Sequence, residues 1–483
     1  MSSLKTKNSQ WFILLFTALI SICLLLLFET EYLIQSIALL FVVSFGGTWI
    51  IYWLSSKLRD TNIIYVEYAF HIKIIIGILL LYLTWTPWLD QSMNTFGYDP
   101  QRYYYDAYEL VAGNFSPEGL PAINYAGIIY YYGIIFYIFG YNPVIPLLIN
   151  YAVTLYAVML LVQVYYMIRK DISPTDWMIG LVLIVPEILW YDLITSRETL
   201  VMSLLLISTL TIGGFIIKKP GDSFSNWNAI LLIPSVFLLG IVRTPMVFPV
   251  LFVSLVYLLF NRNFSFHRLS LLPLAAFSCI AILYAMYIFA ESIGSISIAN
   301  YYDFLKNYIF VENPADPDFL GMEWSEKSLG LLFIPQNWVE ALLYAPIRIF
   351  FYLVSPLPNI FVGFNGLISG RYDSWQHLMS LISSTIYVVL MPFAIISLWD
   401  ILKVKKWSDS IVIIMPFWIV MATISLGNQI IHWRYRIMVV PLLICSIMLG
   451  IRSEQKYVKD VYVVWMIMLI AGGTFFTVYK YIM

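Results

Sequence analysis

Apolar segments long enough to cross a lipid bilayer recur along most of the chain, and this feature limits the possible folds more than any other. A helix needs about 20 mostly apolar residues to span the hydrocarbon core. The sequence predicts such helices at residues 11–28, 33–54, 68–88, 143–168, 177–195, 198–217, 228–242, 245–260, 269–291, 377–401, 409–427, 436–451 and 460–479. We therefore expect an all-α polytopic membrane protein with about 13 transmembrane helices, in a range of about 11–14.

The composition agrees with a chain that is solvated largely by lipid. Hydrophobic residues make up 61% of the 483 residues and charged residues only 11%, a balance that would make a water-soluble protein aggregate. The formal net charge is −1, and no basic stripe is present that could neutralise phosphates along a nucleic acid. We expect membrane lipid and no nucleic acid among the partners.

Basic residues in the short loops predict the orientation, because cytoplasmic loops are rich in Lys and Arg. One side of the predicted helices carries Lys5, Lys7, Lys57, Arg59, Arg169, Lys170, Lys218, Lys219, Arg262, Arg268, Lys403, Lys405, Lys406, Arg452, Lys456 and Lys459. Lys73 is interpreted as lying near the end of a span. The N-terminus is then cytoplasmic, and its first apolar segment stays as a span because FETEY is no small-residue cleavage site. We expect an integral protein of the plasma (inner) membrane.

Two large segments are left on the extracytoplasmic side, at about residues 89–142 and 292–376. Each contains an apolar stretch, at 127–140 and 338–354, that would invert the charge asymmetry if it crossed the membrane. We expect both stretches to be outer-face helices that lie in the interface or re-enter the membrane, where Tyr and Trp are favoured. No Gly/Ser linker divides the chain, so residues 1–483 are treated as a single membrane domain.

Charged residues that lie close to predicted helix ends gather on this outer face. They are Asp99, Arg102, Asp106, Glu109, Arg197, Glu198, Arg243, His432, Arg434 and Arg436. If residues 99–110 form a helix with Asp99 as its N-cap and Pro100 in its first turn, Asp99, Tyr103 and Asp106 share one side. Arg102 can then reach Asp106. The same pattern also fits a capped helix that tyrosines anchor at the membrane surface.

The stretch DPQRYYYDAYELVAGN, followed by YAGIIYYYGIIFYIFGYNPVIPLLINYAVTLYAVMLLVQVYYMIRK, resembles the first outer loop and next helix of GT-C glycosyltransferases. More narrowly, it is similar to the group of protein mannosyltransferases and lipid A aminoarabinose transferases. The matching positions are Asp99, Tyr103, Ala107, Phe139, Gly140, Asn142 and Pro143. Looser matches continue through VPEILWYDLITSRETLVMSLLL, GIVRTPMVFP and RYRIMVVPLL. The chain departs from the group in having Pro100 after Asp99, and in placing Asp99 after the third span and not the first.

The resemblance implies a polyprenyl-phosphate-linked sugar as donor and a glycan, lipid or protein acceptor on the extracytoplasmic face. Asp99 would be the general base, and cations would hold the departing phosphate. Arg434 and Arg436 are the first candidates for phosphate binding, because a guanidinium can bind an anion through two hydrogen bonds. Further candidate substrate-binding residues are Arg102, Tyr103, Asp106, Arg197, Glu198, Arg243, Arg348 and His432.

Several of these residues have a second interpretation. Each Arg can instead pair with lipid headgroups at a helix end, and His432 suits a structural imidazole better than a metal ligand. A divalent cation at Asp99 with Asp106 or Glu109 and simple pairing with Arg102 both remain open. Asp316 and Asp318 fit a cation or acceptor site as well as a solvated loop.

Two other classes of function fit the sequence. A polymerase or ligase of O-antigen or exopolysaccharide would depend on Arg348 and Arg371 more than on Asp99. A transporter of lipid-linked glycan needs charges at membrane depth and broken helices, for which Glu187, after Pro186, and Arg243 are the best candidates.

Overall fold

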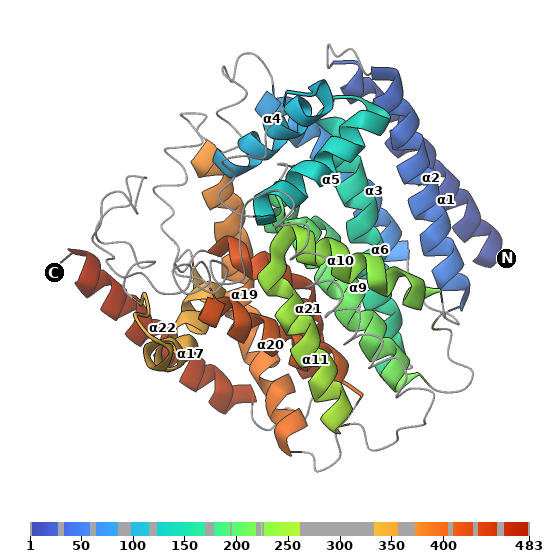
Figure 1. Ribbon diagram of the computed structural model, residues 1–483. Helices are drawn as coiled ribbons and strands as arrows, with labels where there is room; N and C mark the ends of the chain where they lie inside the picture. Colours follow the sequence, from blue (N-terminus) through green and yellow to red (C-terminus); the bar gives the residue numbers. More distant parts are fainter. Residues whose placement is uncertain are drawn as a thin grey trace.

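The computed structural model describes residues 2–27, 33–57, 64–85, 98–114, 123–169, 178–193, 196–218, 224, 227–260, 333–355, 372–403, 409–427, 433–451 and 458–481. Every regular element in these ranges is a helix (Figure 1). The apolar pattern of the sequence predicted this all-helical class, and the described residues confirm it.

The helices of the first half are α1 (Ser2–Leu25), α2 (Leu33–Lys57), α3 (Ile64–Trp85), α4 (Tyr98–Ala112), α5 (Ile123–Phe139), α6 (Val144–Arg169), α7 (Met178–Leu181), η4 (Val182–Ile184), α8 (Pro186–Leu193), α9 (Glu198–Ile217), α10 (Asn228–Arg243), η5 (Thr244–Met246) and α11 (Val247–Phe260). Those of the second half are α17 (Trp338–Val354), α19 (Tyr372–Lys403), α20 (Ile411–Gly427), η6 (Trp433–Val439), α21 (Val440–Ile451) and α22 (Val458–Tyr481). The elements η4, η5 and η6 are 3₁₀-helices.

Within the described ranges, 6 helices are long and apolar enough to cross a membrane: Leu33–Trp53, Ile64–Tyr82, Val144–Arg169, Glu198–Ile217, Leu378–Ile401 and Arg434–Ile451. Shorter apolar helices are Ile13–Leu25, Ala126–Phe139, Asn228–Arg243, Val247–Tyr257 and Ile411–Leu426. These helices indicate a membrane protein. The span predicted at 269–291 lies outside the described residues.

The prediction of one continuous span at 177–195 is wrong. The segment divides into α7, η4 and α8, and the break lies at Val185, whose backbone is extended (φ −56°, ψ 127°). Pro186 follows the break and opens α8, because proline has no backbone N–H to donate to a preceding turn but fits the first turn of a new helix.

The long helix α9 forms the centre of the packing. Nearly all of its residues are buried, because α6, α10, α11 and α20 pack around it. Helices distant in sequence therefore lie side by side, such as α11 against α20 and α8 against α19. Figure 1 shows α1 and α2 at one side of the molecule and α22 at the opposite side.

The apolar stretches predicted as outer-face helices correspond to α5 and α17. At the end of α5, Gly140 has φ 95°, a left-handed conformation that costs glycine little. Asn142 Oδ1 then accepts a hydrogen bond from the N–H of Val144 at 2.9 Å, which caps the start of α6. In the FGYNP segment, Gly140 therefore ends α5 and Asn142 caps the start of α6.

Helix α4 carries the polar stretch that opens the first large outer segment. The helix begins at Tyr98, so Asp99 lies inside its first turn and is not the N-cap that the sequence predicted. Pro100 also lies in that turn, as predicted. Backbone N–H groups in the first turn have no intrahelical acceptor, so a proline there costs no helical hydrogen bond. Gly113, with φ 79°, ends the helix.

Candidate functional site

The carboxylate of Glu198, the first residue of α9, is surrounded by arginines from three elements. Glu198 Oε1 lies 3.7 Å from Arg434 Nε on η6 and 3.9 Å from Arg243 Nη1 at the end of α10. Arg197, the residue before α9, also interacts electrostatically with this carboxylate. We call Arg197, Glu198, Arg243 and Arg434 the arginine cluster.

Tyr435 belongs to the wall of the arginine cluster. Its ring centroid lies 4.5 Å from the guanidinium carbon of Arg243 and 5.1 Å from that of Arg434. Arg434 Nη2 also donates a hydrogen bond to the Tyr435 hydroxyl at 3.3 Å. The aromatic ring therefore stabilises both cations.

The arginine cluster is largely shielded from solvent. Arg197, Glu198 and Arg243 are only 6%, 4% and 3% exposed, whereas the Arg434 side chain keeps 27% of its surface. In the part of the chain that the structure describes, three guanidinium groups thus lie around the carboxylate of Glu198. Guanidinium groups attract anions, more so in a low-dielectric setting, and the partly exposed side chain of Arg434 gives an anion a point of contact.

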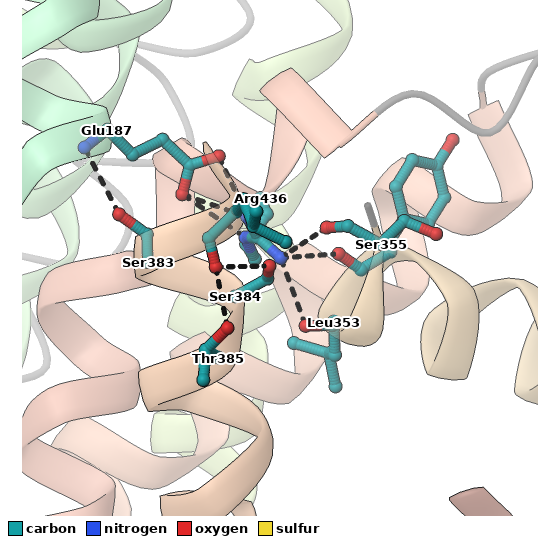
Figure 2. A network of polar contacts seen from close by, with 9 residues as sticks. Glu187, Leu353, Ser355, Ser383, Ser384, Thr385 and Arg436 are labelled. Carbon is teal, nitrogen blue, oxygen red and sulfur yellow. Dashed lines mark hydrogen bonds and ion pairs between the residues drawn. The ribbon is translucent and has the colours of Figure 1, made fainter. Parts of the chain in front are cut away.

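Arg436, two residues after Arg434, is bound differently (Figure 2). Its guanidinium forms a two-pronged ion pair with Glu187, with Nη2 at 2.9 Å from Oε1 and 3.1 Å from Oε2. Arg436 Nη1 donates to the backbone carbonyls of Leu353 at 3.0 Å and Ser355 at 2.6 Å. Both charged side chains are fully buried. These contacts join α8, η6 and the C-terminal end of α17, so they give Arg436 a structural role.

Arg348 is also fully buried. It lies one turn before Tyr352 on α17, and residues four apart share a helix face. The Tyr352 ring lies 6.4 Å from the Tyr435 ring. Arg348 therefore occupies the face of α17 that turns toward the wall of the arginine cluster.

The candidate residues on α4 lie in a different environment. Arg102 Nε lies 3.3 Å from Asp106 Oδ2, and both side chains are partly exposed, which confirms the predicted pairing over one turn. Tyr103 is buried. Helix α4 packs on α5, and α5 packs on α10, so α5 connects the polar face of α4 with the helix that ends at Arg243.

Aromatic residues hold α4 against the end of α5. The rings of Tyr104 and Tyr141 lie 4.7 Å apart, and the ring of Phe136 lies 5.2 Å from that of Tyr104. Burial raises the pKa of Tyr104 and of Tyr141 above the ordinary value of 10.0. Both phenols are therefore neutral at physiological pH, and their hydroxyls are suited to hydrogen bonding.

The remaining predicted residues are described only in part. The backbone of Asp99 is helical, but its side chain lies outside the described part of the chain, as do His432, Asp316, Asp318 and Arg371. Among the side chains that the structure does describe, no group of three His, Cys, Asp or Glu could hold a metal ion. The divalent cation considered at Asp99 therefore stays a prediction.

Sequence reasoning missed two buried polar groupings. Lys73 lies near the middle of α3, not near a span end as predicted, and its ammonium pairs with Asp192 of α8 with both side chains fully buried. The Tyr132 hydroxyl accepts from Asn150 at 3.2 Å and donates to the Ser196 carbonyl at 3.2 Å. A lysine within an apolar helix was the available signal for the first grouping, since charge at membrane depth requires a partner.

Comparison with known proteins gives no relative: no family model matches the chain, and neither a curated protein nor a solved structure matches it.

Proposed function

We propose that this chain is a glycosyltransferase of the plasma membrane that moves a sugar from a polyprenyl-phosphate-linked donor to an acceptor on the extracytoplasmic face. The observation that carries the proposal is the arginine cluster, with three guanidinium groups around Glu198. Lipid phosphate is an anion that reaches a membrane protein through the bilayer, and arginine suits its geometry. A GT-C-like architecture with about 13 spans and a cytoplasmic N-terminus belongs to the same proposal.

In the proposed reaction, an acceptor oxygen or nitrogen attacks the anomeric carbon of the donor sugar. The bond from that carbon to the phosphate oxygen breaks, and the lipid phosphate departs with the bonding electrons. Asp99 accepts the proton of the acceptor group. Arg434, Arg243 and Arg197 stabilise the negative charge that grows on the phosphate, which is where preorganised cations lower a barrier most.

Glu198 has a distinct part in this arrangement. Its carboxylate lies between Arg243 and Arg434 in the structure, and it keeps their like charges from repelling one another when no anion is bound. The incoming phosphate then meets a cluster that is already assembled, so little free energy is needed to order it.

The test is transfer by the purified full chain in lipid nanodiscs, with radiolabelled polyprenyl-phosphate sugars as donors and envelope glycan or lipid fractions as acceptors. Asp99→Asn should abolish transfer, and Arg434→Gln should lower it by about 10²-fold. Lys218→Gln is the matched control, because it removes one positive charge at the opposite end of α9. Transfer that is retained in both variants would refute the assignment.

A second candidate is transport of a lipid-linked glycan without chemistry. It is favoured by the interruption of α7 and α8 by η4, and of α10 and α11 by η5, together with the buried pairs Lys73–Asp192 and Glu187–Arg436. Movement of a labelled lipid-linked sugar across sealed vesicles, with no covalent product, would establish this function in place of transfer.

A further inference from the structure

A buried ion pair lies deep in the protein, apart from the arginine cluster. Lys73 of α3 and Asp192 of α8 are in direct contact, and neither side chain is exposed. The Lys73 ammonium also lies 4.6 Å from the centre of the Tyr151 ring on α6. Gly77 makes room for this ring, since a Cβ at that position would stand 1.9 Å from the Tyr151 hydroxyl. Three helices thus enclose the ammonium.

The pair is connected to the arginine cluster through Ser196 and Arg197, the described residues that lead into α9 and that are called the turn below. The carbonyl of Tyr191, the neighbour of Asp192, accepts hydrogen bonds from two hydroxyls: Ser196 Oγ donates at 3.0 Å and Thr199 Oγ1 at 3.4 Å. Arg197 and Glu198 lie between these two residues. A shift of Asp192 therefore carries Tyr191 with it and displaces the backbone from which both cluster residues project.

The same turn is held from a second direction. The Tyr132 hydroxyl of α5 donates to the Ser196 carbonyl at 3.2 Å, and Asn150 of α6 donates to that hydroxyl at 3.2 Å. The turn is thus attached to α5 through Tyr132 and to α3 through Lys73. Of these two attachments, only the one through Lys73 and Asp192 is an ion pair, and a buried pair holds its geometry tightly because separation would leave two uncompensated charges.

We infer that Lys73 and Asp192 are positioning residues, whose ion pair sets the place of Arg197 and Glu198 in the arginine cluster. The effect on binding rests on the proposed phosphate-binding role of that cluster. Neither residue contacts a member of the cluster through a described hydrogen bond or ion pair, so their influence is transmitted through Tyr191 and the turn.

The first experiment requires no ligand. A double-mutant cycle combines Lys73→Met with Glu198→Gln in the full chain, and thermal unfolding in nanodiscs gives the Tm of each variant. If the Lys73–Asp192 pair positions the turn, the two losses of Tm should not be additive. Lys73→Met would displace the turn and so weaken the ion pairs with Arg243 and Arg434 that Glu198→Gln removes. The control cycle uses Ile78→Ala in place of Lys73→Met; this change opens a cavity at a fully buried position five residues away on the same helix, α3. Its losses should add.

The second experiment measures affinity for geranylgeranyl phosphate, an isoprenyl monophosphate, by titration calorimetry. Lys73→Met should weaken binding about tenfold, which corresponds to about 1.4 kcal/mol, whereas Ile78→Ala should leave binding within about twofold. The double variant Lys73→Met/Asp192→Leu should regain Tm, because no buried charge is left uncompensated, and yet bind as weakly as Lys73→Met.

The outcomes separate this inference from the proposed function. Additive losses of Tm in the Lys73 cycle overturn the positioning role, whether or not the chain binds geranylgeranyl phosphate. The positioning role is also overturned if Lys73→Met/Asp192→Leu binds the probe as tightly as the wild type. Coupled losses with a wild-type chain that fails to bind the probe support positioning and count against the phosphate site. Coupled losses with weakened binding support both.

Discussion

Removal of the Glu187 carboxylate should destabilise the protein severely. In the structure Arg436 is fully buried, and Glu187 is the acidic side chain that pairs with it, through a two-pronged contact. The change Glu187→Ala leaves the guanidinium charge inside the protein without that carboxylate. Breaking a buried pair in this way typically costs about 3–5 kcal/mol.

The contacts that remain place the expected cost toward the lower end of that range. Arg436 Nη1 keeps its hydrogen bonds to the carbonyls of Leu353 and Ser355 at the C-terminal end of α17 (Figure 2). A helix C-terminus carries partial negative charge and stabilises a cation by up to about 2 kcal/mol in a partly buried geometry. We therefore expect Glu187→Ala to lower the free energy of unfolding by about 3 kcal/mol.

The assay is denaturant unfolding in mixed micelles, followed by circular dichroism. Asp106→Ala is the control, because it breaks the exposed pair with Arg102 and should cost no more than about 0.5 kcal/mol. The double variant Glu187→Leu/Arg436→Met should recover most of the loss, since both charges are gone. If Glu187→Ala costs as little as Asp106→Ala, the reasoning on this buried pair is wrong.

Three local features give further predictions, each measured as the change in unfolding free energy in the same assay. Gly140→Ala should cost about 1–2 kcal/mol because its φ of 95° suits glycine alone; an equally stable variant would contradict the left-handed end of α5. Asn142→Ala should cost about 1 kcal/mol through loss of the bond from the Val144 N–H, and Asn142→Asp should retain it. Asn337→Ala should cost about 1 kcal/mol, because Asn337 Oδ1 caps α17 by accepting from the Glu340 N–H at 3.0 Å. Full stability of either alanine variant would mean that the cap contributes nothing.

The sequence predicted features that depend on residues close together along the chain. Apolar runs of spanning length predicted the helical class, and the pairing of Arg102 with Asp106 followed from their spacing on one helix face. The N-cap was placed wrongly, because a helix start depends on the residues on both sides of it, and Asp99 lies within the first turn of α4. The division of the 177–195 segment was missed because apolar length alone does not show that Pro186 starts a new helix.

The candidate site depended on the sequence for its residue types and on the tertiary structure for its partners. The arginines and Glu198 could be singled out because charge is costly in an apolar chain. Which of them meet was decided by the packing of α9, α10 and η6, which brings Arg243 and Arg434 to the same carboxylate. Arg434 and Arg436 looked equivalent in the sequence, yet one joins the arginine cluster and the other pairs with Glu187. The physical reason is that a buried charge must be compensated in space, and distance along the chain does not determine which group is near enough to do so.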